Sequence, residues 1–572
     1  MRRTDSACDP NEVAVKSFFL GPSAENEEWL TGQISDFLQS WTQWRKRVSG
    51  EDGGLITDRD RELPEFKRQQ QFTSDVIREI SRRFEDEIPK FSPRYIGHMF
   101  SEISMPALLG HMITLLHNPN NISVEASTVG TEIEKQAIEA LCTMIGYSEG
   151  VGHFTSGGTV ANFEFLFRAR ERLSKWLAAA IATGEKDVFR ASAMGWDEFH
   201  RRSQDLPEVD FRRLLLHENP IENLRTIREH LGFDLKPPVL LVSASKHYSW
   251  PKAMHYLGLG EPNVRYVKLD DKGRMSVADL QLQIEQCRLE NIPLLGVVAI
   301  VGTTELGTVD PIQAIVTTLD ELEREHGLRI WLHLDAAYGG FFRSVIRGEA
   351  AGSIDVGVLR DLTAMKEADS VTLDPHKLGY VPYASGAFIC RDEEDYFVKS
   401  FTGPYIVSDR KNLGNFTIEG SRSAAGAVAT YASLKAFEGS DGYARILSRA
   451  VSTKLEFREA LIEAGLHVFF PEGLDTNLLC FAVLGKETRL SDVNRLNLSL
   501  YERCQAAGRY WISKTTLNRD HFGALIEGGC AKHGLTLDTD EMVLLRLTLM
   551  NPFVLSKEGP TDHARAFAES LQ

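Results

Sequence analysis

Short apolar runs alternate with amphipathic segments through the middle of this 572-residue chain. Six runs, rich in β-branched and aliphatic residues, lie between about residues 130 and 390: 237–245, 264–270, 294–304, 329–337, 370–376 and 386–392. Continuous apolar strands separated by helices are typical of a mostly parallel sheet that is covered on both faces. The pattern therefore predicts an α/β domain, whose ligands would bind at the carboxyl ends of the strands.

The N-terminal hundred residues carry a helical pattern instead. Residues 23–48 place apolar side chains at three- and four-residue spacing, begin with acidic residues and end with basic ones. This arrangement predicts an amphipathic helix whose charges complement its dipole. A Gly- and Asp-rich linker is expected at 49–64, and a second amphipathic helix around 73–88.

The C-terminal part combines both patterns. Helical segments over 434–464 precede strand-like runs at 477–485 and 543–553, which predicts a smaller α+β domain. We therefore expect three parts: an N-terminal helical segment (1–110), a large α/β domain (111–425) and a C-terminal α+β domain (426–572).

Composition and charge narrow the possible partners. The chain is 43% hydrophobic and 25% charged, with a net charge of −16, so a surface that binds nucleic acid is not expected. No apolar run is long enough to cross a membrane, and the N-terminus lacks the apolar segment of a secretory signal. The seven cysteines are scattered without a CxxC motif, which argues against disulfides and zinc. We expect a cytoplasmic protein that binds neither metal, membrane nor nucleic acid.

A glycine turn marks a candidate anion site. In TSGGTVANF, residues Ser156, Gly157, Gly158 and Thr159 would present backbone N–H groups and hydroxyls at the start of a long helix. The segment matches neither GxGxxG nor GxxxxGK[ST], which argues against a dinucleotide site and a P-loop. Taken alone, an ordinary cap between a loop and a helix explains it as well.

Three further motifs follow the ends of predicted strands. RIWLHLDAA ends in Asp335, SVTLDPHKLGY carries Asp374, His376 and Lys377, and KHYSW carries His247. A buried carboxylate needs a cationic partner, and a lysine in such surroundings can become a nucleophilic amine. Each motif also has an ordinary explanation, namely a helix cap, a surface lysine and a core histidine.

Together, these motifs describe one ligand. A planar molecule with a phosphate at one end, a protonated ring nitrogen and an aldehyde would engage the anion loop, the aspartate and the lysine at the same time. Pyridoxal phosphate has this shape, and it pairs a lysine Schiff base with an acidic partner for its ring nitrogen. The sequence therefore predicts pyridoxal phosphate as cofactor.

Longer stretches of the chain resemble a known family. RYIGHMFSEISMPALL (94–109), NPNNISVEAS (118–127), KHYSW, HLDAAYGG, DPHKLGYVPYASG and EGSRSAAGA are similar to the group II pyridoxal-phosphate-dependent decarboxylases, and within them to the bacterial-type tyrosine decarboxylases. The resemblance implies fold type I of the transferase-like enzymes, with a mostly parallel seven-stranded sheet. It also implies a homodimer with its active sites at the subunit interface.

The resemblance assigns residues to the cofactor. Lys377 would form the Schiff base, Asp335 would pair with the ring nitrogen, and His247 would stack on the ring and take part in catalysis. The phosphate would lie on the 156–159 loop. Further cofactor contacts would come from Thr303, Ala337, His376 and, across the subunit interface, Ser421.

The substrate side is assigned in the same way. Arg422 would bind the α-carboxylate as a bidentate fork, with His98 and Thr548 nearby. Residues 397–416 are expected to form a loop that excludes water, from which Tyr405 would deliver a proton, although Phe401 competes for that position.

The expected reaction is decarboxylation of an L-amino acid to an amine and CO2, with tyrosine or DOPA as substrate. Ile96 and Thr548 depart from the tyrosine-type pattern at positions that we expect near the substrate side chain. Glutamate or another acidic or non-protein amino acid therefore remains an alternative, as does another reaction of type-I enzymes, such as that of a carbon–carbon lyase or of an aldehyde-forming oxidative deaminase. An inactive binding protein is disfavoured because Lys377, Asp335, His247 and Arg422 are all present.

Overall fold

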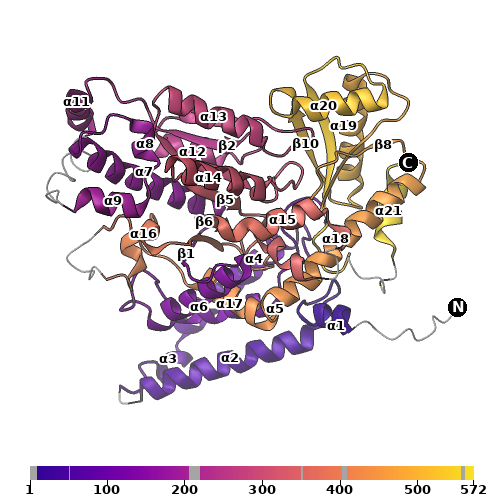
Figure 1. Cartoon of the computed structure of the whole chain (residues 1–572). Helices are drawn as coiled ribbons and strands as arrows, with labels where there is room; N and C mark the ends of the chain where they lie inside the picture. The colour runs from indigo at the N-terminus through magenta and orange to yellow at the C-terminus, as the bar shows by residue number, and fades with distance from the viewer. Residues whose placement is uncertain are drawn as a thin grey trace.

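The fold is taken from a computed structural model, which describes residues 10–50, 52–204, 220–348, 352–401, 409–554, 559 and 561–572. A seven-stranded sheet forms its centre, with strand order β1-β7-β6-β5-β4-β2-β3 (Figure 1). The strands are β1 Val151–Thr155, β2 Val239–Ser243, β3 Val264–Val267, β4 Leu294–Ile300, β5 Leu332–Ala336, β6 Ser370–Leu373 and β7 Gly386–Cys390. Only β7 runs antiparallel to its neighbours within this sheet. The predicted mostly parallel seven-stranded sheet is thereby confirmed.

Six of these strands follow the predicted apolar runs, whereas β1 does not. Its sequence, VGHFT, mixes Gly and His with apolar residues, so it lacks the β-branched run that marks the others. Pairing with β7 makes it a strand, because the register places Val151 opposite Cys390 and Thr155 opposite Gly386. Pairing with β7, rather than a local sequence pattern, therefore makes this segment a strand.

Helices cover both faces of the sheet. One core joins it to α7 (Gly158–Ala182), α11 (Pro220–Leu231) and α12 (Ser249–Tyr256). The other joins it to α6 (Thr128–Ile145), α13 (Val277–Leu289), α14 (Ile312–His326) and α15 (Val356–Ala364). The neighbouring β4 residues Val297 and Val298 pack into different cores, because successive side chains of a strand point to opposite faces.

Shorter elements complete the large domain: α5 Met105–His117, α8 Val188–Ser192, α9 Trp196–Ser203, α16 Glu393–Tyr396, α17 Ala425–Ala436, and the 3-10 helices η1 Glu261–Asn263, η2 Gly339–Arg347, η4 Met365–Glu367 and η5 Leu413–Phe416. None of the helices in the described part of the chain has the length and apolar character needed to span a membrane.

The N-terminal elements are α1 Pro10–Ser17, α2 Glu27–Val48, α3 Asp58–Glu62 and α4 Pro64–Phe84. Helix α2 lies along one edge of the molecule and packs against α5 (Figure 1). Helix α4 begins nine residues before its predicted start at 73, because Pro64 occupies the first turn, where proline favours a helix. The predicted domain boundary at residue 110 falls inside α5, and the three-part division stays a prediction.

The C-terminal part contains a four-stranded antiparallel sheet of order β10-β11-β9-β8. Its elements are α18 Ser440–Glu463, β8 Val468–Phe469, β9 Leu478–Val483, α19 Leu490–Ala507, β10 Ser513–Asn518, α20 Arg519–His533, β11 Glu541–Thr548 and α21 His563–Ser570. This agrees with the α+β character expected for the region.

The segment 94–98 crosses to the C-terminal sheet. The Ile96 N–H donates to the Trp511 carbonyl at 3.0 Å, and the Thr548 N–H donates to the Ile96 carbonyl at 2.7 Å. The Ile96 side chain is fully buried in the core of the C-terminal part. The expectation that Ile96 lies near the substrate side chain is therefore wrong, because backbone pairing turns the residue into that core.

Candidate active site

A cavity of about 300 Å³ opens at the carboxyl ends of five parallel strands, β1, β2, β4, β5 and β6. It is lined by Ser156, Gly157, Gly158, Thr159, Val160, Asn162, Ser245, His247, Ile300, Gly302, Thr304, Asp335, Ala337, Tyr338, Asp374, His376 and Lys377. Nine of the predicted site residues are therefore brought together in one pocket, although they are spread over more than two hundred positions of the sequence.

The glycine loop forms one wall of this pocket. Helix α7 begins at Gly158, directly after β1. A Cβ atom on Gly158 would lie 2.8 Å from Asp374 Oδ2, and one on Gly157 would lie 3.2 Å from His376 Cε1. Side chains at these positions would therefore fill the cavity. The N–H of Ser156 donates to the Glu419 carboxylate at 3.1 Å, so this donor is engaged within the chain.

Lys377 lies in the turn that follows β6. Its Nζ is 3.0 Å from Asp374 Oδ2, and His376 Nε2 is 3.4 Å from the same oxygen. Burial would raise the pKa of Asp374, but Lys377 and His376 outweigh it and hold that pKa below its ordinary value. Asp374 Oδ1 has no hydrogen-bond partner among the described residues. The lysine thus carries its own buried counter-ion, with one oxygen to spare.

Asp335 and His247 lie on neighbouring strand ends. Asp335 belongs to β5 and accepts two N–H bonds on Oδ2, from Trp250 and Asn162, each at 3.0 Å. His247 follows β2, and its Nδ1 accepts the Ser249 N–H at 3.3 Å. Burial lowers the pKa of His247, with Asp335 acting in the opposite direction. A neutral imidazole therefore stands beside a negative charge in the same cavity.

Thr303 does not line the pocket, although the sequence predicted a cofactor contact there. The Thr303 hydroxyl lies 2.8 Å from the Thr308 hydroxyl and accepts the Thr308 N–H, and its side chain is buried. Thr304, the next residue, lines the pocket instead. The GTT motif was correctly placed at a strand end, but the turn that it forms directs Thr303 into the loop.

Arg422 does not have the role that the sequence predicted, which was to bind the substrate α-carboxylate. Its Nη1 lies 2.5 Å from Glu134 Oε1 and 2.9 Å from the Phe154 carbonyl, and its Nη2 donates to the Asn121 carbonyl. The side chain does not line the pocket. Arg422 therefore does not face a substrate carboxylate in this chain, because its fork is spent on a buried ion pair and two carbonyls.

The neighbouring Ser421 lies on the surface. Its hydroxyl accepts a hydrogen bond from Asn120 Nδ2 at 3.1 Å, and it is not part of the pocket lining of its own chain. The expected contact of Ser421 with a phosphate in a second subunit stays a prediction.

Thr548 and His98 lie beside the pocket. The Thr548 hydroxyl donates to the Gly97 carbonyl at 3.2 Å and is not part of the pocket lining, and the expected substrate contact of Thr548 stays a prediction. The contact with Gly97 fixes the segment that carries His98, whose Nδ1 is 3.5 Å from Arg546 Nη2. Arg546 in turn donates to the carbonyl of the pocket residue Thr304 at 2.5 Å.

Tyr405 lies outside the described residues, and its expected role stays a prediction. Phe401, the competing aromatic, is 58% exposed, and its N–H donates to the Asn415 carbonyl.

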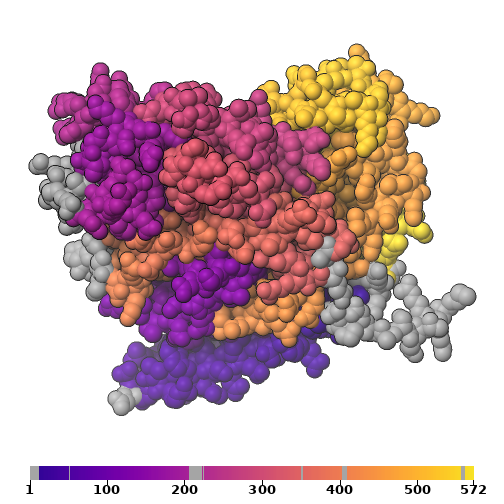
Figure 2. Space-filling view, in the orientation of Figure 1, coloured from indigo at the N-terminus to yellow at the C-terminus, as the bar shows by residue number. Residues whose placement is uncertain are grey.

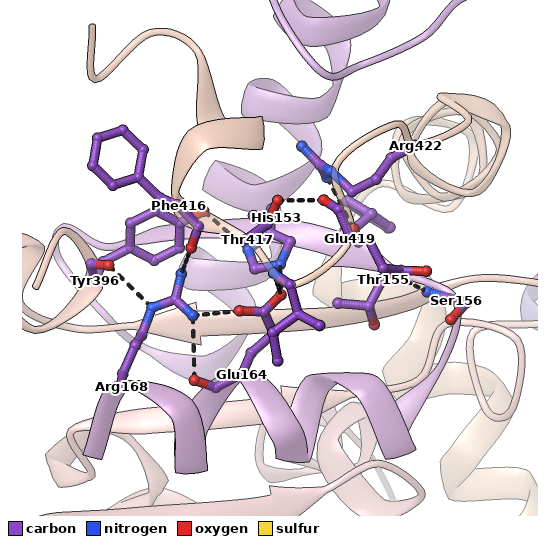
Figure 3. Close-up of polar contacts among 12 residues, drawn as sticks. His153, Thr155, Ser156, Glu164, Arg168, Tyr396, Phe416, Thr417, Glu419 and Arg422 are labelled. Atoms are coloured by element: carbon purple, nitrogen blue, oxygen red, sulfur yellow. Dashed lines mark hydrogen bonds and ion pairs between the residues drawn. The ribbon is translucent and has the colours of Figure 1, made fainter. Parts of the chain in front are cut away.

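A buried ion-pair cluster lies beyond the pocket and joins Glu164 and Arg168 of α7 to His153 of β1 (Figure 3). Arg168 donates to the backbone carbonyls of Tyr396 (3.0 Å) and Phe416 (2.7 Å). It also donates to the backbone carbonyl of Glu164 and to Oε2 of the Glu164 carboxylate. It therefore binds the chain on both sides of the predicted loop.

Sequence reasoning missed several pocket residues, of which Asn162, Thr304 and Tyr338 line the cavity and Arg546 adjoins it. Asn162 stands one helical turn after the glycine loop, so helix periodicity could have indicated it. Arg546 stands inside a predicted strand of another domain, and no local pattern connects it with the pocket. Asp374 was noted in the motif but was assigned no role.

Known proteins give independent information. Residues 230–483 match the family model of the pyridoxal-dependent decarboxylase conserved domain. The chain is 30% identical to an L-tyrosine decarboxylase of Enterococcus faecalis over 450 residues, which is 74% of this chain and 71% of that protein. It is 27% identical to an L-tyrosine decarboxylase of Enterococcus faecium, with 98% of both chains covered.

The fold has the same relatives. The crystal structure of Oryza sativa TDC with PLP and tryptamine superposes with a TM-score of 0.60, at 17% identity, over 99% of this chain and 98% of that one. The cofactor expected from the motifs, the fold and the sequence relatives agree, and the chain belongs to the group II pyridoxal-phosphate-dependent amino acid decarboxylases.

Proposed function

We propose that this decarboxylase acts on an aromatic L-amino acid, tyrosine or DOPA, and releases the corresponding amine and CO2. One observation on the pocket carries the choice of substrate class. Among the described lining residues Lys377 is the only lysine or arginine, and Asp374 already neutralises it, while Asp335 adds a further negative charge. A second carboxylate, as in glutamate, would meet no spare cation in this lining. The relatives named L-tyrosine decarboxylase support the same substrate class.

The lining residues fit pyridoxal phosphate. Two buried oxygens, Asn162 Oδ1 and Asp374 Oδ1, have no partner among the described residues, and the missing side chains at Gly157 and Gly158 leave room that a Cβ would fill. The hydroxyls of Ser156 and Thr159, with the N–H groups at the start of α7, suit a phosphate. Ala337 and His376 complete the cavity around them.

Pyridoxal phosphate, when bound, supplies a ring that takes up the electron pair left by the departing carboxylate. Lys377 Nζ, which lies beside Asp374, would be the amine that holds the cofactor aldehyde. The Asp335 carboxylate would pair with the ring nitrogen. His247 would lie against the ring, where its neutral imidazole adds no charge.

Arg546 is our candidate for the substrate α-carboxylate, in place of Arg422. Its side chain is buried and forms no ion pair with a carboxylate in the described residues, while it reaches Thr304 and His98 at the edge of the pocket. A buried guanidinium without a counter-ion favours the binding of an anion. His98, whose pKa is lowered by burial and by Arg546, would remain neutral beside it.

A substrate panel tests the function. We expect amine and CO2 from tyrosine or DOPA at a higher kcat/KM than from phenylalanine, tryptophan, glutamate or aspartate. Faster turnover of an acidic amino acid would overturn the aromatic assignment. Aldehyde with ammonia as the main products, formed with consumption of oxygen, would point to an oxidative deaminase, and a complete lack of turnover would point to a binding protein.

We also propose that the protein is a homodimer in which α4 is covered by the second copy. No residue of α4 is buried in the single chain. Its apolar stripe includes Phe72 (64% exposed), Ile77 (57%) and Phe84 (68%). Figure 2 shows the preceding helix α2, in indigo, along the lower edge of the molecule. A continuous apolar stripe on a 21-residue helix is unusual for a surface in contact with water. Two-fold symmetry brings identical stripes together.

Sedimentation equilibrium would test the dimer. We expect twice the chain mass for the native protein, and the single-chain mass for Ile77→Asp. Leu282→Asp is the matched control, because Leu282 is 68% exposed on α13, outside the stripe. A native protein that sediments as a monomer at micromolar concentration would refute the proposal. The expected contact of Ser421 with the active site of the second subunit depends on this dimer.

We place the enzyme in the cytoplasm, a proposal supported by the free state of all six described cysteines.

A further inference from the structure

The two oxygens of the Asp335 carboxylate have different surroundings. Oδ2 accepts the Trp250 indole N–H at 3.0 Å and the Asn162 amide N–H at 3.0 Å. Oδ1 has one long contact, with the Ala337 N–H at 3.4 Å. One oxygen is therefore fully engaged within the chain, whereas the other keeps the capacity to accept a short hydrogen bond from a ligand in the pocket that Asp335 lines.

The two donors belong to different helices that meet at the end of β5. Trp250 is in the first turn of α12, is fully buried, and packs edge-on against Phe165 and His333. Asn162 is in the first turns of α7, is 1% exposed, and also donates to the Ser249 hydroxyl at 3.0 Å. Asp335 is thus held from two sides by elements that themselves line or support the pocket.

The orientation of the Asn162 amide follows from these contacts. Its Oδ1 is buried without a partner among the described residues, while Nδ2 serves both Asp335 and Ser249. Rotating the amide by 180° would place Oδ1 against the negative Oδ2 of Asp335. In this orientation Asn162 donates to both neighbours and leaves one acceptor oxygen free beside the pocket.

Two N–H donors on a buried carboxylate stabilise its negative charge and fix its rotamer. The apolar surroundings of Trp250 account for its aromatic ring, but they do not account for the polar indole N–H. Carbonyl groups or water could satisfy that N–H elsewhere, but here its partner is the one carboxylate that faces the predicted ring nitrogen.

We propose that Trp250 and Asn162 are positioning residues for the decarboxylation: they hold Oδ2 of Asp335 by two hydrogen bonds and thereby orient Oδ1 toward the ring nitrogen of the cofactor. This inference rests on the role of Asp335 given under the proposed function. It adds Trp250, which is not part of the pocket lining, and Asn162, whose Nδ2 acts through Asp335.

The test uses holoenzyme reconstituted with pyridoxal phosphate labelled with 15N in the ring. Trp250→Phe keeps the aromatic ring and removes the donor. We expect the 15N resonance to move toward the value of the unprotonated ring, and kcat to fall about tenfold to a hundredfold with KM within about twofold. Asn162→Ala removes the second donor and should act in the same direction, so the test stands even if one variant folds poorly.

Trp331→Phe is the matched control. Trp331 is 1% exposed, packs edge-on against the same Phe165, and donates its indole N–H to the Ser370 hydroxyl at 2.9 Å rather than to Asp335. We expect it to lose stability as Trp250→Phe does, but to leave the 15N resonance and kcat unchanged. A shift of equal size in both variants would overturn the proposal, because the effect would then come from general packing.

Asp335→Asn separates this inference from the assignment beneath it. If Asp335→Asn moves the 15N resonance and Trp250→Phe and Asn162→Ala do not, the positioning role is refuted and the role of Asp335 stands. If Asp335→Asn leaves the resonance in place, the assignment of Asp335 to the ring nitrogen fails, and the positioning role fails with it. The substrate class plays no part in this readout.

Discussion

The buried polar side chains on and next to helix α7 form two groups, which differ in whether their hydrogen-bonding atoms all have partners. At the N-terminal end of the helix, Asn162 and the adjacent Asp374 each leave a buried oxygen without a partner among the described residues, beside a cavity. Further along, the buried ion-pair cluster has both nitrogens of His153, both carboxylate oxygens of Glu164 and all three guanidinium nitrogens of Arg168 engaged in hydrogen bonds.

The difference distinguishes a ligand site from a structural one. Arg168 and Glu164 are fully buried, and every bond they make stays within the chain. Lys377 is 23% exposed in its side chain and faces the pocket together with a carboxylate that has an oxygen to spare. Unused hydrogen-bonding capacity at a cavity indicates a role toward a ligand, because buried polar groups are otherwise satisfied.

The largest expected effect tests the pocket side of this comparison. Lys377→Ala should lower kcat about ten-thousandfold, a loss of roughly 5 kcal/mol in transition-state stabilisation. Borohydride reduction of the native holoenzyme should fix the cofactor on the peptide that contains Lys377, as read by mass spectrometry, and Lys377→Ala should retain none. Lys252→Ala, an exposed lysine of α12, should behave as the native protein. Label on another lysine would contradict the assignment.

The cluster side should respond in stability rather than in catalysis. Arg168→Met leaves the Glu164 carboxylate buried without its cation, so the free energy of unfolding should fall by about 3–5 kcal/mol. The double variant with Glu164→Gln should recover part of that loss, because it removes the uncompensated charge. Urea unfolding measures both. Arg288→Met, which breaks the exposed pair with Glu285, should leave the midpoint where it is; an equal drop there would remove the distinction.

Acid should weaken the cluster in a defined range of pH. Burial would raise the pKa of Glu164, but its electrostatic interactions with His153 and Arg168, together with hydrogen bonds from His153 and the Ile418 N–H, hold it at about 2, against 4.5 for the free group. A lowered folded-state pKa stabilises the protein above pH 4.5, and this contribution is lost as the pH falls from 4.5 toward 2.

The loss amounts to about 3 kcal/mol, since one pKa unit corresponds to about 1.4 kcal/mol. The free energy of unfolding, measured from pH 7 to pH 3, should therefore fall more steeply in the native protein than in Glu164→Gln. Parallel curves would show that Glu164 keeps its ordinary pKa.

The smallest expected effect separates Arg546 from Arg422, because one variant should change kcat/KM and the other the free energy of unfolding. Arg546→Met should lower kcat/KM about tenfold to a hundredfold, as expected for the loss of a charged hydrogen bond worth about 1.5–3 kcal/mol. Arg422→Met should lower stability instead, because it strands Glu134. Steady-state kinetics at matched folded fractions would separate the two. The reverse result, a kinetic defect confined to Arg422→Met, would restore the assignment that the motif suggested.

The errors of the sequence analysis have one physical origin. Thr303 and Thr304 are neighbours, and only the turn closed by the Thr303–Thr308 bonds decides which one faces the cavity. Arg422 looked free because its counter-ion, Glu134, stands 288 positions earlier in the chain. Ile96 looked like a pocket residue until backbone pairing with Trp511 placed it in another core.

The sequence alone determined the class of fold and the order of the cofactor motifs. Apolar runs of strand length between helices specify a covered parallel sheet, and polar residues at the ends of such runs converge at one edge of it, because both properties follow from local periodicity. Asp335, His247, Lys377 and the 156–159 loop met in one pocket for this reason.

Only the tertiary structure decided which charges remain available to a ligand. Arg422 and Arg546 are the same residue type, each in a buried setting, yet one is paired with Glu134 and the other adjoins Thr304 at the pocket. Trp250 contacts Asp335 across 85 positions of sequence. The energy of a buried charge depends on the groups within a few ångströms of it, and chain folding brings those groups from distant positions that no local pattern records.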